Sequence, residues 1–146
     1  MSFKKEIISS SPEETLSAGE GYASSLKKNT VTGLYGNLGS GKTQFVKGIC
    51  RHYNVNDIVS SPTFTIVNEY TGNENTSGSK IMIIHFDLYR LRNIKELTEI
   101  GIDHYVCDSS ICVIEWPELA DQYFKGDIAK IYFEHGKSFN ERLIKF

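Results

Sequence analysis

Short apolar runs alternate with amphipathic segments along this chain of 146 residues. Apolar side chains dominate 31–35, 81–84 and 111–114, which is typical of strands that are buried on both faces of a parallel sheet. Segments 11–28 and 42–53 carry apolar side chains at helical spacing, which predicts amphipathic helices. This alternation predicts an α/β fold of three layers, with helices on both faces of a central sheet.

Weaker patterns predict the remaining elements. The expected elements are a first strand at 3–9, a strand at 64–70, a polar loop or hairpin end at 71–80, short helices at 94–100 and 117–124, and two antiparallel strands at 128–133 and 142–146. Together they predict a mostly parallel core with an antiparallel extension.

Length and composition narrow the class of protein. A chain of this length is expected to form one domain, residues 1–146. The formal charge of −2 gives no general attraction to nucleic acid or to an acidic membrane. The three cysteines form no C-x-x-C pair, which favours reduced thiols over a zinc site or a disulfide framework. Met1 to Ser10 lacks the apolar run of a secretion signal, and no stretch approaches membrane-spanning length, so we expect a cytoplasmic protein.

A phosphate-binding loop follows the strand at 31–35 and matches G-x-x-x-x-G-K-[ST] in full. It reads Gly36-Asn37-Leu38-Gly39-Ser40-Gly41-Lys42-Thr43. Its glycines let backbone N–H groups and the start of the next helix form a concave nest for phosphate oxygens. Lys42 can reach the β- and γ-phosphates, and the Thr43 hydroxyl can bind Mg²⁺. A coincidental glycine-rich turn is the alternative, but the strand before and the helix after favour nucleotide binding.

The helix predicted at 11–28 begins with a strong start signal. Ser11 can cap it, Pro12 suits the first helical position, and Glu14 completes a capping box. The lysines at 27–28 suit the negative end of the helix dipole. Most of this helix is expected to cover the sheet, while its start at Ser11 is a candidate contact with the nucleotide base.

Residues 60–65, Ser-Ser-Pro-Thr-Phe-Thr, follow the phosphate-loop helix. Pro62 keeps Ser61 extended, and the hydroxyls of Thr63 and Thr65 come next. In phosphate-loop proteins a loop at this place often closes on the γ-phosphate and Mg²⁺ and relaxes after hydrolysis. The residues alone leave two interpretations open, such a switch or a simple turn into the next strand.

Two apolar strands end in a carboxylate, at Asp87 and at Glu115. Parallel strands bring such ends to the edge of the sheet where ligands bind. Phosphoryl transfer to water needs an acid that orients the metal and a group that positions the water. Spacing alone does not assign the two acids to these roles. A structural role remains the alternative for each, as a helix cap or a partner of Arg90.

The base and the remaining side chains are less clearly indicated. The chain contains no guanine-specific N-K-x-D sequence, which favours adenine. His85 is a candidate for a place near the metal or for a hydrogen-bonded core histidine. Trp116 is a candidate for a packing anchor, a nucleotide sensor or a partner contact.

These motifs together resemble one family, TsaE (also YjeE), the small bacterial ATPase of tRNA threonylcarbamoyladenosine (t6A) synthesis. Besides the phosphate loop, the matching blocks are Ser61-Pro62-Thr63-Phe64-Thr65, Asn68-Glu69-Tyr70, His85-Phe86-Asp87-Leu88-Tyr89-Arg90-Leu91, Glu99-Ile100-Gly101 and Ile114-Glu115-Trp116-Pro117-Glu118. They follow the order of the family and span residues 36 to 118.

The resemblance implies a protein that binds ATP or ADP with Mg²⁺, hydrolyses ATP slowly, and works with TsaB and TsaD on ANN-decoding tRNAs without touching a membrane. It implies that Thr43 and Glu115 hold Mg²⁺ and that Asp87 serves catalysis near the γ-phosphate. It also implies that the segment from Ser61 to Thr65, with the Thr63 and Thr65 hydroxyls, is a switch. Trp116 and Glu118 are expected near the nucleotide.

The chain departs from the family pattern at two loop positions. Asn37 stands where many members have aspartate, and Ser40 where many have alanine. Both changes are small and leave the phosphate nest intact. The amino-terminal region and the last strands carry no comparable signature.

Two other functions remain as alternatives. A nucleotide-dependent binding switch needs no significant turnover. A small-molecule kinase is the weaker alternative, because such enzymes usually need an arginine-rich lid and this chain has four arginines, Arg51, Arg90, Arg92 and Arg142.

Overall fold

A mixed sheet of seven strands forms the centre of the computed structural model, which describes residues 2–146. The strands are β1 (Glu6–Ser9), β2 (Thr30–Tyr35), β3 (Val67–Asn73), β4 (Lys80–Asp87), β5 (Ser110–Glu115), β6 (Ala129–His135) and β7 (Arg142–Lys145). Their order across the sheet is β1-β7-β6-β2-β5-β4-β3. The consecutive strands β3 and β4, and β6 and β7, pair directly as antiparallel neighbours, whereas the connections that lead into the parallel strands β2 and β5 and from β5 to β6 carry helices.

The four central strands, β6, β2, β5 and β4, run parallel to one another. β3 pairs antiparallel with β4 at one flank, and β7 pairs antiparallel with β6 and β1 at the other. The predicted α/β fold, with a parallel core and an antiparallel extension, is confirmed. The antiparallel part lies on both flanks, whereas the sequence indicated it only near the carboxyl end.

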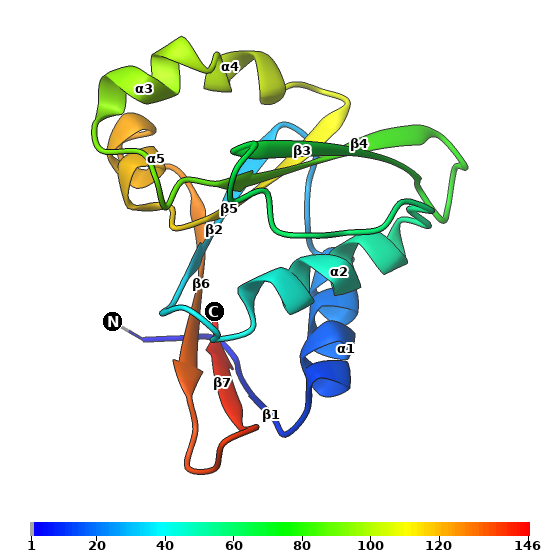
Figure 1. The fold of residues 1–146 in the computed structure, drawn as a ribbon. Helices are drawn as coiled ribbons and strands as arrows, with labels where there is room; N and C mark the ends of the chain where they lie inside the picture. Colours follow the sequence, from blue (N-terminus) through cyan, green and yellow to red (C-terminus); the bar gives the residue numbers. More distant parts are fainter. Residues whose placement is uncertain (1) are drawn as a thin grey trace.

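Helices cover both faces of the sheet (Figure 1). α1 (Pro12–Ala23) and α2 (Lys42–His52) pack on one face, and α3 (Ile94–Glu99), α4 (Ile102–Tyr105) and α5 (Glu118–Tyr123) lie on the other. Each face buries its own hydrophobic cluster, which explains why the central strands are apolar on both sides. Within residues 2–146, every helix is too short or too polar to cross a membrane.

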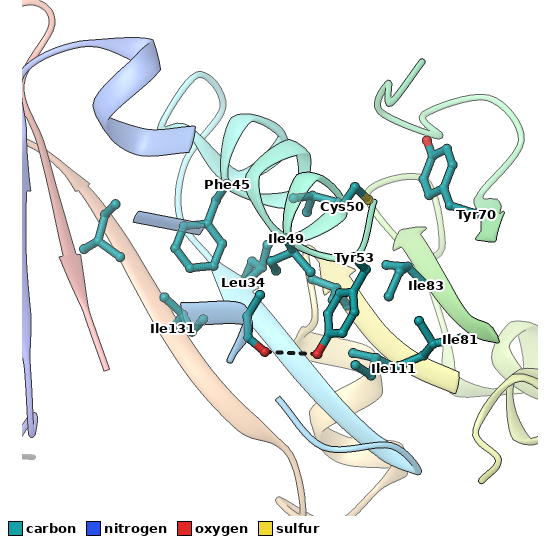
Figure 2. Close-up of a cluster of buried hydrophobic side chains, with 14 of the residues drawn as sticks. Leu34, Phe45, Ile49, Cys50, Tyr53, Tyr70, Ile81, Ile83, Ile111 and Ile131 are labelled. Atoms are coloured by element: carbon teal, nitrogen blue, oxygen red, sulfur yellow. Dashed lines mark hydrogen bonds between the residues drawn. The ribbon is translucent and has the colours of Figure 1, made fainter. Parts of the chain in front are cut away.

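Helices α1 and α2 touch backbone to backbone. A Cβ atom added at Gly48 would lie 1.9 Å from the Leu16 carbonyl oxygen, and one added at Gly19 would lie 2.1 Å from that of Phe45. Any larger residue would push the helices apart, so both positions require glycine. The Tyr53 hydroxyl then ties the end of α2 to α1 by donating to the Ala23 carbonyl at 3.0 Å, above the apolar residues of β4 and β5 (Figure 2). These contacts fix the position of α2 against α1, and therefore the position of the phosphate loop that precedes α2.

Several boundaries differ from the prediction. Ser11 caps α1 as predicted, since its hydroxyl accepts the Glu14 N–H at 3.1 Å, but the Glu14 carboxylate accepts the N–H of Ser10 at 2.6 Å and not that of Ser11. The helix also ends earlier than predicted, at Ala23. The lysines at 27–28 therefore lie outside the helix and do not interact with its dipole. β3 begins at Val67 and not at 64, because the chain from 60 to 66 forms a loop. The polar segment at 71–80 is partly strand, and helix α4 is an element that the sequence did not indicate.

One face of β4 and β5 changes character along its length. On the α2 side, β4 presents Ile81 and Ile83 and then His85 and Asp87, while β5 presents Ile111, Val113 and then Glu115. The apolar half supports the core, and the polar half reaches the carboxyl edge of the sheet. This edge is where the loop after β2 also lies.

Candidate nucleotide-binding site

A cleft of about 470 Å³ opens at the carboxyl edge of the parallel strands. Residues predicted for the site that line it are Ser11, Leu38, Gly39, Ser40, Gly41, Lys42, Thr43, Thr63, Asp87, Glu115 and Trp116. They come from the residue that caps α1, the phosphate loop, the start of α2, the loop at 60–66 and the ends of β4 and β5. The structure therefore brings most of the predicted site to one place.

The phosphate loop is shaped by close contacts that only glycine permits. A Cβ at Gly36 would lie 2.6 Å from the Ser40 Oγ and 2.8 Å from the Phe133 carbonyl oxygen. Gly41 caps α2 with φ of 102°, a backbone conformation that side chains disfavour. The first turn of α2 contains no acidic residue of its own, so the positive end of the helix dipole is not offset from within the helix. The loop and helix end thus suit an anion.

Lys42 crosses the loop and is only 5% exposed. Its Nζ donates to the Gly36 carbonyl and lies 3.7 Å from the centroid of the Trp116 ring. Burial lowers the pKa of Lys42, while the nearby carboxylates of Glu115 and Asp87 oppose that shift. The ammonium group is therefore held by a carbonyl and an aromatic face beside the phosphate nest.

Glu115 and Thr43 meet although they are 72 positions apart in the chain. The Thr43 hydroxyl lies 2.9 Å from Oε1 and 3.1 Å from Oε2 of Glu115. His85 Nε2 lies 2.8 Å from the same Oε2, and both side chains of this pair are buried. The carboxylate of Glu115 is thus aimed at the first turn of α2.

Asp87 lies beside Glu115 in the register of β4 and β5 but has other partners. Its Oδ2 accepts the Ser61 hydroxyl at 3.0 Å and faces the Thr63 hydroxyl at 3.4 Å. Its Oδ1 accepts the backbone N–H of Tyr89 at 3.0 Å. The loop from 60 to 66 therefore closes over this carboxylate.

Trp116 follows Glu115 in an unusual backbone conformation, with φ of 54°. This left-handed geometry turns the chain after β5 and puts the indole ring into the cleft. The ring also packs on Tyr89, with centroids 4.9 Å apart. The ring therefore lies beside the phosphate loop, against Lys42 and Tyr89, and its role as a packing anchor, a nucleotide sensor or a partner contact stays a prediction.

Four residues predicted for the site do not line the cleft: Gly36, Asn37, Thr65 and Glu118. Gly36 still contributes its carbonyl to Lys42. The Thr65 hydroxyl instead donates to Asn68 at 3.3 Å, away from Asp87. Glu118 is an exposed residue at the start of α5. Its negative charge opposes the lowering of the Lys42 pKa by burial.

Sequence reasoning missed the contribution of the last strand and hairpin. Arg142 on β7 donates from Nε and Nη2 to the Gly39 carbonyl, at 3.2 and 3.0 Å, and it lines the cleft with Asn140. Arg142 and Gly39 are 103 positions apart, so no local pattern connects them. Thr15 on α1 also lines the cleft. The one feature of the sequence that could have indicated this is its position one helical turn after the capping residue Ser11.

The site fits a nucleotide and a magnesium ion. The buried Ser40 hydroxyl has no hydrogen-bond partner within residues 2–146, although it lies in the wall of the phosphate nest. Thr43 and Glu115 present a hydroxyl and two carboxylate oxygens to one point. Mg²⁺ prefers oxygen ligands and is usually held by one or two protein groups together with substrate phosphates.

A strand, a G-x-x-x-x-G-K-T loop and a helix at the carboxyl edge of a parallel sheet define a P-loop nucleotide-binding protein. Comparison with known families then identifies the group within this class. The family model described as Threonylcarbamoyl adenosine biosynthesis protein TsaE matches residues 9–144, and the chain belongs to this family.

Individual relatives agree with this assignment. The chain is 33% identical over 135 residues to the tRNA threonylcarbamoyladenosine biosynthesis protein TsaE of Bacillus subtilis (strain 168), covering 92% of this chain and 80% of the relative. It is 39% identical over 120 residues to the TsaE protein of Aquifex aeolicus (strain VF5), covering 81% and 80%. The crystal structure of Bacillus subtilis YdiB superimposes with a TM-score of 0.74 at 28% identity, covering 100% of this chain and 86% of that one.

Proposed function

We propose that this protein binds ATP and ADP with Mg²⁺, hydrolyses ATP slowly, and supports t6A modification of ANN-decoding tRNAs together with TsaB and TsaD. The contact between Thr43 and Glu115 carries the proposal. It joins the residue that ends the phosphate loop to a carboxylate from a neighbouring strand, which is the pairing that a P-loop metal site requires.

The phosphate loop binds the phosphates in this proposal. Backbone N–H groups from Gly39 to Thr43 and the start of α2 surround the phosphate oxygens. The Lys42 ammonium leaves the Gly36 carbonyl, which accepts its hydrogen bond in the present structure, and pairs with the β- and γ-phosphates. The Ser40 hydroxyl has no competing partner within the described residues and is free to donate.

Thr43 and Glu115 would hold Mg²⁺, and the ion would neutralise charge on the β- and γ-phosphates when bound. Asp87 acts on the other side, where its carboxylate orients the attacking water and accepts a proton. Ser61 and Thr63, which face Asp87, form the switch that reports the γ-phosphate.

The adenine end of the nucleotide lies toward the start of α1 in this proposal. Ser11 lines the cleft beyond the phosphate loop, and Trp116 lines it beside Lys42. Glu118 lies just after Trp116 and acts on Lys42 through its charge. Thr65 is left out of the catalytic set, because its hydroxyl is directed to Asn68.

A binding switch without significant turnover is the second candidate, and one observation favours it. Both oxygens of Asp87 are engaged by the chain, by the Tyr89 N–H and by two loop hydroxyls. These contacts use most of the acceptor sites of the carboxylate, which limits its access to water while the loop stays in place. In this candidate the partner proteins respond to whether ATP or ADP is bound to this protein, and rapid hydrolysis is not needed.

TsaB and TsaD are the proposed partners, and tRNA is reached through the complex that they form. The formal charge of −2 gives this chain no general attraction to tRNA. We place the protein in the cytoplasm, where tRNA modification takes place, with no membrane contact.

Calorimetry and single-turnover hydrolysis test these proposals together. The protein should bind ADP and ATP, more tightly with Mg²⁺ than with a chelator, and it should hydrolyse ATP faster when TsaB and TsaD are present. Absence of nucleotide binding would reject both candidates. Binding without hydrolysis in the presence of both partners would leave only the binding switch.

A further inference from the structure

His85 is a fully buried histidine on β4 to which the proposed function assigns no role. On the same sheet face its neighbours are Ile83 on β4 and Val113 on β5, both members of the hydrophobic cluster beneath α2. Its other neighbours are Asn68 on β3 and, toward the carboxyl edge, Asp87 on β4, so His85 lies where this face changes from apolar to polar. The imidazole that stands there lies 2.8 Å from the carboxylate of Glu115.

The direction of this hydrogen bond follows from its partner. An ionised carboxylate is an acceptor only, and the Thr43 hydroxyl, which has one hydrogen to donate, lies 2.9 and 3.1 Å from the two oxygens of Glu115. His85 must therefore donate from Nε2, and the hydrogen is on that nitrogen. The other ring nitrogen, Nδ1, is buried and has no hydrogen-bond partner within residues 2–146.

The unpartnered Nδ1 argues against a purely structural role. A buried polar atom without a hydrogen bond destabilises a fold, so an apolar residue would serve the core better. What the imidazole provides is one N–H, on Nε2, that is directed at the Glu115 carboxylate. The Thr43 hydroxyl does not replace it, because in the proposed function that hydroxyl is itself a metal ligand.

We propose that His85 is a positioning residue for metal binding, which holds the Glu115 carboxylate through its Nε2–H in the orientation that binds Mg²⁺ with Thr43. This inference rests on the proposed function and assigns a residue to it. Groups that hold a metal ligand from behind typically change metal affinity by about 10- to 100-fold. The bond is formed between two neighbouring strands, so its geometry is as rigid as the sheet.

A pair of amide variants separates the hydrogen bond from the bulk of the ring. In His85→Gln the side-chain amide reaches about as far as Nε2, whereas in His85→Asn it ends near the place of Nδ1. The measured quantity is the ratio of ADP affinity with Mg²⁺ to ADP affinity with a chelator. His85→Asn should lower this ratio about tenfold, and His85→Gln should keep most of it. Metal-free ADP binding should change in neither variant.

A third variant covers the case in which the asparagine protein does not fold. His85→Met fills a similar space without a donor and should lower the ratio as His85→Asn does. If all variants keep the wild-type ratio, or if metal-free binding falls as much as binding with Mg²⁺, the inference is overturned. A wild-type protein that binds ADP equally with and without Mg²⁺ would instead reject the proposed metal site itself.

Nitrogen NMR of the wild-type protein gives a direct readout of which ring nitrogen of His85 carries the hydrogen. With labelled histidine, the signal of His85, assigned by its loss in His85→Gln, should show a hydrogen on Nε2 both with Mg²⁺ and ADP and without them. An imidazole that carries its hydrogen only on Nδ1 would overturn the inference.

Discussion

The two acids at the edge of the sheet are neighbours in register, yet different kinds of structure hold them. Glu115 is bonded by Thr43 in the first turn of α2 and by His85 within β4, both parts of packed elements. Asp87 is bonded by hydroxyls of Ser61 and Thr63, which belong to a loop. We call these the helix side and the loop side of the cleft.

The loop side also carries backbone strain. Ile66, at the end of the loop, has φ of 71°, which is rare for a β-branched residue. Its carbonyl accepts the Asp87 N–H at 2.9 Å, so the strained residue is tied to the acid. Strain of this kind is found where a segment changes conformation. Trp116, next to Glu115, also has a positive φ of 54°, so strain alone does not distinguish the two sides. From the kinds of element that hold the two acids, we expect the loop side to move while the proposed metal site on the helix side stays fixed.

The largest expected effect tests the loop side. Asp87→Asn should slow hydrolysis by about 100-fold, because removing a general base typically costs that much or more. ATP affinity should change little, since in the proposed function the helix side holds the phosphates and the metal. Single-turnover rates and calorimetry on the same preparation measure both. If ATP affinity falls as much as the hydrolysis rate, Asp87 contributes to ATP binding as well, and the proposed division between the two sides is rejected.

Lys42 tests phosphate binding on the helix side. Lys42→Ala should weaken ATP binding by about 10- to 100-fold, the equivalent of a hydrogen bond to a charged group. Lys80, exposed at the far end of β4, provides the control, and Lys80→Ala should bind ATP normally. Calorimetry that finds unchanged ATP affinity for Lys42→Ala would reject its proposed role.

Glu115 tests the metal site itself. Glu115→Ala should lower Mg²⁺-dependent ADP binding at least about tenfold, since even groups behind a metal ligand have such effects. Metal-free ADP binding should stay the same. Glu118→Ala is the matched control, an exposed acid outside the cleft, and should have a smaller effect. Equal losses with and without Mg²⁺ would make Glu115 a structural residue.

The smallest expected effect concerns the mobility of the loop. Ser61→Ala removes the 3.0 Å hydrogen bond to Asp87, which should speed amide exchange in residues 60–66 by about two- to tenfold. Exchange in β5 and α2 should not change. Thr65→Ala is the control, because its hydroxyl bonds to Asn68 and not to Asp87. Exchange that rises equally in both variants would show that the Asp87 contact does not hold the loop.

Local patterns in the sequence were enough to predict the phosphate loop and the strand ends. The loop depends on glycine spacing, a preceding strand and a following helix, all of which are contiguous in the chain. The carboxylates could be placed at the edge of the sheet because each follows a buried run. The end of α1 was predicted wrongly: the helix ends at Ala23, and Lys28 lies beyond it, where it pairs with Glu74 at 3.0 Å.

The sequence by itself therefore determined the class of fold, the phosphate nest and the set of acids that could meet it. Only the tertiary structure decided which acid meets Thr43, which histidine stands behind it, and that Arg142 reaches the loop from the last strand. These contacts depend on the order of the strands and on the close crossing of α1 and α2. That order is set by burying both faces of the whole sheet at once, a constraint that no short stretch of sequence contains.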